Sequence, residues 1–197
     1  MGFDGWESFT SIYFETFTLP LTWIPLWVGV ALHQTLVDEG YPKERMHLKW
    51  PNDLYLDWES KGAGILCEKT EKGIAVGVGV NLISHPDGIG RETSSLQALR
   101  GLPLPMDSAE TLLQKLIENL KQEPSVADLK SAFEQKSLFK SGESVAWLDS
   151  RSGISNQGKV QGLGDFGELR VLSESGDLLK LYSEEISGIR KKELHEK

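Results

Sequence analysis

The chain lacks the features on which several classes of protein depend. Its single cysteine, Cys67, cannot form an internal disulfide and fits a reducing compartment, so we expect the protein in the cytoplasm. No basic cluster is longer than Arg190 to Lys192 and the net charge is −8, so a nucleic-acid partner is not expected. A phosphate backbone requires a concentrated positive surface, which this composition does not supply.

Long hydrophobic runs are also missing. The apolar stretch from Leu19 to Leu32 is shorter than the roughly 20 residues of a membrane-spanning helix, and it contains Pro20 and Pro25. The segment from Met1 to Glu7 has no positively charged start of the kind that opens a signal peptide. The sequence therefore predicts neither a signal peptide nor a membrane anchor.

Two hydrophobic patterns divide the chain. Up to residue 138, short apolar strands alternate with helical periodicity, and from residue 139 to 190 the period is close to two, with turns rich in Gly and Ser. We expect an α+β domain over residues 1–138 and a small SH3-like β-barrel over 139–190. The predicted strands of the first domain are Phe9–Phe17, Leu54–Leu56, Ala63–Cys67 and Ile74–Val80. Three helices are predicted: Pro25–Gly40, a helix that begins at Asp107 or Ser108, and Val126–Lys136. In the first helix, Leu26, Val30 and Val37 lie on one face.

Polar residues gather unusually densely in one stretch of the predicted strands. The runs from Lys49 to Leu56, Lys61 to Leu66 and Gly77 to Asn81 contain two Lys, one Asp and two Asn among several glycines. A carboxylate can hold Mg²⁺, a lysine presents a point charge to an anionic oxygen, and glycine lets a ligand approach the backbone. The alternative is a plain turn followed by packed strands, because a lone Gly-x-Gly is weak evidence of a site.

The same residues resemble a family signature. Lys-Trp-Pro-Asn-Asp-Leu-Tyr-Leu at 49–56, Lys-Gly-Ala-Gly-Ile-Leu-Cys-Glu at 61–68 and Gly-Val-Gly-Val-Asn-Leu at 77–82 look like the central motifs of the biotin protein ligases. The likeness extends over roughly residues 45 to 187 and includes Thr93 to Leu96 before a helix. It implies a mixed β-sheet with flanking helices, like the catalytic domain of class II synthetases and biotin ligases. The implied reaction joins biotin to ATP, and the biotinyl group of biotinyl-5'-AMP then passes to one lysine of a carboxylase carrier domain.

The resemblance assigns roles by position. Lys61 would reach the biotin carboxylate and stabilise the charge that develops there, and Asp53 would hold Mg²⁺. The residues that would contact biotin or ATP are Lys49, Trp50, Asn52, Gly64, Leu66 and Asn81. For Lys49 and Asn52 the alternative is that they only brace the turn. A carrier domain is the expected partner, and a homodimer is left open.

One motif of the family is absent from this chain. Biotin protein ligases carry a Gly-Arg-Gly-Arg-x-Gly loop upstream of the strand and helix predicted at 9–40, and no Gly-Arg-Gly occurs here. We therefore expect either a truncated or misstarted chain or a member that has lost part of its active site. The alternative function is a catalytically impaired homologue that acts as a ligand- or carrier-binding scaffold. A lipoate ligase or octanoyl transferase ranks third, because neither is expected to carry the Lys-Trp-Pro-Asn-Asp run.

Overall fold

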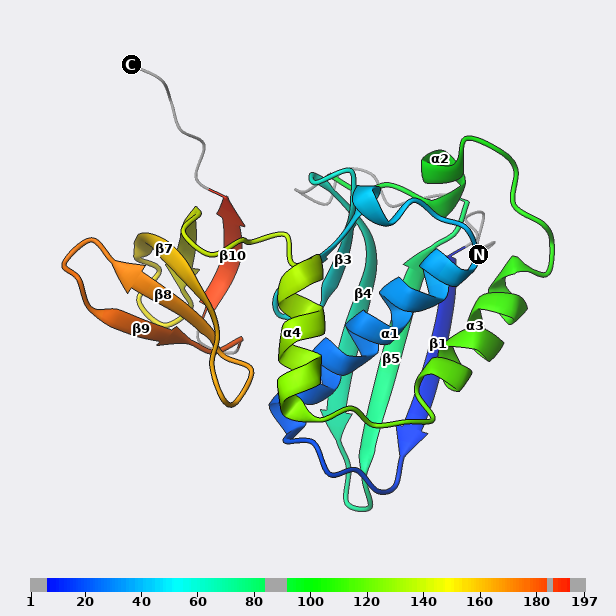
Figure 1. The fold of residues 1–197 in the computed structure, drawn as a ribbon, viewed down its shortest axis with the longest axis horizontal. Helices are drawn as coiled ribbons and strands as arrows, with labels where there is room; N and C mark the ends of the chain where they lie inside the picture. Colours follow the sequence, from blue (N-terminus) through cyan, green and yellow to red (C-terminus); the bar gives the residue numbers. More distant parts are fainter. Residues whose placement is uncertain (1–6, 84–91, 184–185, 192–197) are drawn as a thin grey trace. The chain divides into compact units, whose positions relative to one another are not determined.

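The computed structural model describes residues 7–83, 92–183 and 186–191 and divides the chain into two compact units, Met1–Leu138 and Phe139–Lys197. Predicted features at 1–6 and 84–91, among them the loop containing His85, lie outside the described residues. Within the described ranges, no helix is both long enough and apolar enough to span a membrane. Each unit contains one five-stranded sheet (Figure 1).

The first unit is built on an antiparallel sheet with the strand order β1-β5-β4-β3-β2. Strict alternation in Ile-Ala-Val-Gly-Val-Gly-Val makes β5 bury one face, because every second side chain points the same way. In the described part of the chain, parallel pairing is confined to two isolated bridges, Leu48 with Ser137 and Lys61 with Thr93. The strands are β1 (Glu7–Phe14), β2 (Met46–Lys49), β3 (Asp53–Leu56), β4 (Ser60–Lys69) and β5 (Ile74–Asn81).

Helices cover one face of this sheet, and none of the described helices covers the other, which is called the open face below (Figure 1). The long α1 (Ile24–Asp38) contacts β2, β3 and β4 and is flanked by α3 (Ser108–Asn119) and α4 (Val126–Lys136). Ser125 begins α4 by accepting a hydrogen bond from the amide of Asp128, as a helix N-cap does. Shorter helices lie at Leu21–Trp23, Lys43–Arg45 and α2 (Leu96–Arg100).

The helix α1 differs from its prediction in how it is buried. Val30 and Val37, expected on the buried face with Leu26, are only partly buried, whereas Trp27, Val28 and Leu32 are buried. The helix contacts the sheet, α3 and α4, so most of its circumference is covered. A helix enclosed in this way carries no single apolar stripe. Cys67, on β4, is partly buried.

The second unit is an antiparallel sheet with the order β10-β6-β7-β8-β9. Short strands split by turns fit the SH3-like barrel that the sequence predicts, and the closure of the barrel stays a prediction. The strand β10 was not foreseen. The strands are β6 (Ser144–Asp149), β7 (Ser155–Leu163), β8 (Leu169–Ser173), β9 (Leu178–Leu181) and β10 (Ile186–Lys191).

The α+β fold class predicted from the sequence is confirmed. The helix Val126–Lys136 has the predicted bounds, and the hairpin formed by β3 and β4 and the glycine strand β5 lie where the sequence places them. The first strand ends at Phe14 rather than Phe17. These elements bring the polar residues of the family signature onto one sheet.

Candidate active site

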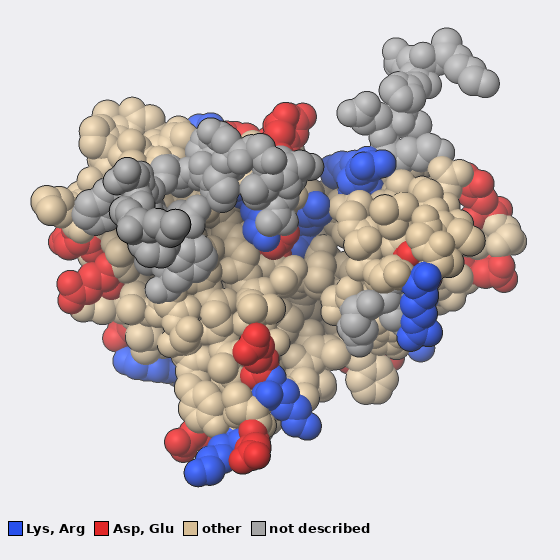
Figure 2. Space-filling model, turned by 180° about the vertical axis from the view of Figure 1, so that it is seen from behind, with Lys and Arg blue, Asp and Glu red and all other residues tan. Residues whose placement is uncertain are grey.

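The predicted site residues meet on the open face of the first sheet. Residues paired across antiparallel strands point to the same face, and Asp53 pairs with Gly64, which in turn pairs with Gly79. Lys49 pairs with Asp53 from the other side. Figure 2 views the molecule from the side opposite the helices, and there acidic and basic side chains lie next to one another on a mostly uncharged surface.

A β-bulge at Gly62 puts Lys61 on this face. Leu54 pairs with Ala63 and Tyr55 with Lys61, so Gly62 is left without a partner in β3. Strict alternation would place Lys61 and Gly64, three residues apart, on opposite faces, and the extra residue of the bulge reverses this. A Cβ at position 62 would lie 2.6 Å from the Cγ atom of Leu56, so any other residue there requires this buried side chain to move.

The bulge brings Lys61 into contact with Asp53. The ammonium group of Lys61 donates a hydrogen bond to Oδ1 of Asp53, and the side chains are only 18% and 15% exposed. A largely shielded ion pair interacts more strongly than one at the surface. The two residues to which the resemblance gives the central roles are therefore adjacent, and the pair is available to exchange its internal contact for contacts with a ligand.

Gly64 lies directly beneath this ion pair. A Cβ on Gly64 would stand 2.8 Å from Nζ of Lys61 and 3.4 Å from Oδ1 of Asp53. The missing side chain leaves room for the lysine to extend along β4, over Gly64, to the carboxylate on β3. Leu66, two residues on and on the same face, is 62% exposed and adds an apolar surface beside the glycines.

Asn81 joins three segments behind Lys61. Its side-chain amide donates to the carbonyl oxygen of Lys61 at 3.2 Å and to that of Ser94 at 3.0 Å. The backbone of Lys61 also pairs with the 92–94 segment, since its amide donates to Glu92 and its carbonyl accepts from Ser94. With its amide hydrogens used in this way, Asn81 retains its side-chain oxygen as the group to offer a ligand.

Asn52 and Trp50 lie beside the site, in the turn between β2 and β3. The side-chain amide of Asn52 donates to the carbonyl of Ile65 at 2.7 Å, and the carbonyl of Asn52 accepts from the amide of Ile65 at 2.9 Å. Asn52 thus ties the turn before β3 to β4, which is the bracing role considered for it. Trp50 precedes a cis peptide bond to Pro51 and is 3% exposed.

Lys49 contacts Tyr55, two strand positions beyond Asp53. Its ammonium group donates to the phenol oxygen of Tyr55 at 2.9 Å and lies 4.5 Å from the centre of that ring. Tyr55 is 7% exposed and shares the open face with Lys61, its partner across the strands. Sequence reasoning treated Tyr55 as an apolar strand residue, although its two-residue spacing from Asp53 already places both on one face.

The roles of the predicted residues in ligand binding stay predictions. The structure brings together Lys49, Asp53, Lys61, Gly64, Leu66 and Asn81 on one face or at its margin. Asn52 and Trp50 lie at its edge, in the turn between β2 and β3. The arrangement offers two cations, one carboxylate, open glycine backbone and an apolar side chain, which suits an anionic ligand with an apolar portion.

Comparisons with known proteins all find similarity to biotin ligases or to the family that contains them. The biotin/lipoate A/B protein ligase family matches residues 10–82. The biotin–[acetyl-CoA-carboxylase] ligase of Paracoccus denitrificans is 43% identical over 64 residues, which span 30% of this chain and 26% of that protein. This match therefore covers much less than two thirds of the relative's length.

Solved structures extend the likeness to nearly the whole chain. The apo biotin protein ligase of Aquifex aeolicus is 28% identical with a TM-score of 0.76, covering 94% of this chain and 83% of that one. The same enzyme in complex with biotin and ATP has a TM-score of 0.75 at 28% identity, over 94% and 78%. The Leishmania major ligase in complex with biotinyl-5-AMP, 18% identical, has a TM-score of 0.58 over 91% and 79%, a likeness of fold alone.

Proposed function

We propose that this chain, which resembles the biotin protein ligases in sequence and in fold, activates biotin with ATP and transfers it to a lysine of a carboxylase carrier domain. The observation that carries this proposal is the contact between Lys61 and Asp53 on the face that also holds Gly64. An apolar ligand with one carboxylate matches the combination of Leu66, bare glycine backbone and a lysine. ATP supplies the second anionic group.

The reaction has two steps. In the first, a carboxylate oxygen of biotin attacks the α-phosphorus of ATP, the bond to the β-phosphate oxygen breaks, and pyrophosphate leaves. In the second, the neutral amine of the carrier lysine attacks the acyl carbon of biotinyl-5'-AMP, AMP leaves, and the amine proton passes to solvent. Both steps place negative charge on oxygens beside the site, where a fixed cation lowers the barrier.

Lys61 is the group that would meet this charge. Its ammonium lies at the surface of the sheet with one carboxylate partner, so it can turn from Asp53 to the reacting oxygens without leaving the site. Asn81 holds the backbone of Lys61 through its carbonyl, which limits the movement of the residue to its side chain. Positioning of this kind contributes to catalysis by keeping the charged group close to the reacting atoms.

The donor set at Asp53 fits the magnesium that the family implies. Mg²⁺ in nucleotide sites is held by one or two carboxylates together with phosphates of the substrate. Within the described residues, no group of three or more His, Cys, Asp or Glu side chains could hold a metal by itself. Asp53 would therefore hold Mg²⁺ that arrives with ATP, and the ion would neutralise phosphate charge.

The remaining assignments are those that the resemblance implies. The backbone of Gly64 and the side chain of Leu66 would contact biotin, because they lie beyond Lys61 on the apolar part of the face. The side-chain oxygen of Asn81 would face the adenylate. Trp50 and Asn52 would support the nucleotide end from the turn between β2 and β3, and Lys49 would add a second cation.

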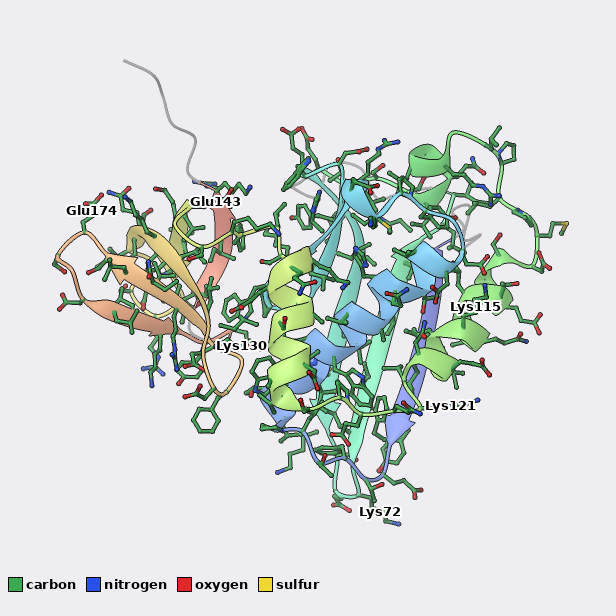
Figure 3. All side chains as sticks on the ribbon, viewed as in Figure 1. Lys72, Lys115, Lys121, Lys130, Glu143 and Glu174 are labelled. Atoms are coloured by element: carbon green, nitrogen blue, oxygen red, sulfur yellow. The ribbon has the colours of Figure 1, made fainter. Side chains whose placement is uncertain are left out.

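The proposal is tested with the full chain, biotin, radiolabelled ATP and Mg²⁺. We expect biotinyl-5'-AMP and pyrophosphate to form, and biotin to appear on a carboxylase carrier domain that is added afterwards. Lys61→Ala and Asp53→Ala should each abolish both products. The matched control is Lys115→Ala, which breaks the ion pair of Lys115 with Glu39 on the helix side, where Figure 3 places Lys115 on α3.

The outcomes separate the two functions considered. Labelling that survives Lys61→Ala or Asp53→Ala contradicts the proposed roles, and a loss of labelling in Lys115→Ala would show that the effect is not specific to the site. A wild-type chain that binds biotin and ATP by calorimetry but forms no adenylate would instead be a ligand-binding scaffold. A wild-type chain that biotinylates the carrier excludes that alternative.

A further inference from the structure

The two lysines of the open face have partners of different charge. Lys61 is paired with the carboxylate of Asp53, so the two charges cancel. Lys49 contacts the neutral phenol of Tyr55, and within the described residues no carboxylate forms an ion pair with it. Within the described residues, Lys49 is therefore the lysine of this pair that forms no ion pair.

Tyr55 fixes the place of that charge through two contacts. The phenol oxygen accepts a hydrogen bond from Nζ of Lys49 at 2.9 Å, and the ring face lies 4.5 Å from the same atom. A lysine side chain has several rotatable bonds, and both contacts restrict it to one region. The ring itself is held firmly, because Tyr55 is 7% exposed within β3.

The pair presents mainly hydrogen-bond donors to a ligand. The ammonium keeps two hydrogens beyond the one given to Tyr55, and the phenol keeps its own hydrogen. No acceptor among the described residues takes that phenol hydrogen in a recorded bond. A group of donors with a net positive charge selects an anionic oxygen, either a carboxylate or a phosphate.

We propose that Tyr55 is a positioning residue that holds Lys49, which forms no ion pair with any described residue, where it can bind an anionic oxygen of the substrates. This inference rests on the proposed function. It adds Tyr55 to the site and gives Lys49 and Lys61 different roles. Lys61 becomes available only when it leaves Asp53, whereas Lys49 is available from the outset.

The test measures binding to the full chain by calorimetry, with biotin, ATP without metal, and pyrophosphate as separate probes. Tyr55→Phe keeps the ring and removes the oxygen that accepts from Lys49. We expect it to weaken binding of at least one probe about fivefold to tenfold, the size of one lost charge-assisted hydrogen bond. Tyr13→Phe is the matched control, since its phenol bonds Thr70 at 3.2 Å on the same face but away from the lysines.

The double variant decides whether Tyr55 acts through Lys49. Lys49→Met should weaken the same probe, and adding Tyr55→Phe to it should cause no further loss, because the cation to be positioned is gone. A further loss in the double variant, or unchanged binding in Tyr55→Phe, overturns the proposal. Weakening of biotin alone identifies a carboxylate as the anion, and weakening of ATP and pyrophosphate identifies a phosphate.

Adenylate formation by the wild-type chain keeps this proposal separate from the proposed function. A chain that binds the probes as expected, with the predicted loss in Tyr55→Phe, but makes no biotinyl-5'-AMP supports the positioning role and contradicts the enzyme. A chain that makes the adenylate with unchanged KM for biotin and ATP in Tyr55→Phe supports the enzyme and contradicts the positioning role. Thermal unfolding of Tyr55→Phe near the wild-type temperature excludes a general loss of structure as the cause.

Discussion

The side-chain amide of Asn81 donates to the backbone carbonyl of Lys61 across 3.2 Å, from the end of β5 to the start of β4. The same amide donates to Ser94 across 3.0 Å, so one side chain holds the lysine between two segments distant in the sequence. Each carbonyl would lose a donor if this amide were removed. Asn81 therefore determines how firmly Lys61 is presented to a ligand.

We expect Asn81→Ala to lower the free energy of unfolding by about 1–3 kcal/mol, the cost of two hydrogen bonds and the carbonyls left behind. Binding of biotin and ATP should weaken as well, because the backbone of Lys61 is released. The control is Asn119→Ala, which removes a bond of 3.0 Å to Thr35 on the helix side of the unit. That control should lose stability without losing affinity, and wild-type affinity in Asn81→Ala would contradict the role of Asn81.

A methyl group at Gly64 tests the space between Lys61 and Asp53. The Cβ of Gly64→Ala would lie 2.8 Å from Nζ of Lys61, and the lysine can move aside because it is a flexible side chain. We expect the fold to be kept and adenylate formation to fall about 100-fold, since a small misplacement of a reacting group has an effect of this size. Urea unfolding and the rate of pyrophosphate release measure the two effects.

Gly77→Ala is the control for Gly64→Ala. It lies on the same open face, but its added Cβ would meet its nearest atoms, in Leu66, at 3.8 and 4.0 Å, an ordinary contact distance. It should leave stability and the pairing of Lys61 with Asp53 nearly unchanged. A rate for Gly64→Ala equal to that for Gly77→Ala would show that the ion pair does not need the gap.

His33 should make the stability of the first unit depend on pH. The side chain is 4% exposed, and burial followed by the nearby charge of Lys136 lowers its pKa from 6.5 to about 4. His47 also disfavours the charged form, and a hydrogen bond with the backbone of Met46 partly opposes both effects. Because the folded state resists protonation, its stability is complete above pH 6.5 and is lost as the pH falls toward 4.

Urea unfolding between pH 7.5 and 4.5 measures this effect. We expect the free energy of unfolding to fall by about 2–3 kcal/mol over this range in the wild type, and His33→Leu to remove most of that fall. Carboxylates that hydrogen bonds keep ionised affect the free energy of unfolding only at lower pH. Asp57, whose pKa Arg45 lowers from 3.8, loses its contribution only below about pH 4. An equal fall in His33→Leu would assign the pH dependence to other groups.

The sequence predicted the regular part of the fold well, because local signals and tertiary structure agree there. In β5, alternating large and glycine residues match one buried and one open face. In α4, apolar residues at helical spacing follow a Ser that caps the first turn. The strand β10 carries no such signal, since Gly188 and a register shift between Ser187 and Arg190 interrupt its alternation.

The sequence names the candidate residues of the site but does not give their arrangement. The motif identifies Asp53 and Lys61, yet alternation gives no sign of the bulge at Gly62 that turns Lys61 toward Asp53. The bond of Lys49 to Tyr55 likewise depends on strand register, which a single sequence does not display. Spacing names the candidates for a site, whereas pairing across strands decides which of them meet.

Gly164 and Glu168 provide a test of the second unit by itself. Glu168 is 2% exposed, and its carboxylate accepts from the amide of Phe166 at 2.9 Å and from Nε of Arg170 at 3.4 Å. A Cβ on Gly164 would overlap that carboxylate, which has no exposed region to move into. We expect Gly164→Ala to destabilise the unit by about 3–5 kcal/mol, because it separates a buried charge from its donors.

Gly153→Ala separates this clash from the general cost of replacing a turn glycine. Its φ is +68° and nothing lies within 4 Å of the added Cβ, so only the left-handed backbone opposes the change, at about 1 kcal/mol. Hydrogen exchange in β7 and β8 measures both variants, and exchange should be much faster in Gly164→Ala than in Gly153→Ala. Equal exchange in the two variants would mean that the carboxylate of Glu168 adapts to a methyl group, and that position 164 requires glycine no more than an ordinary turn does.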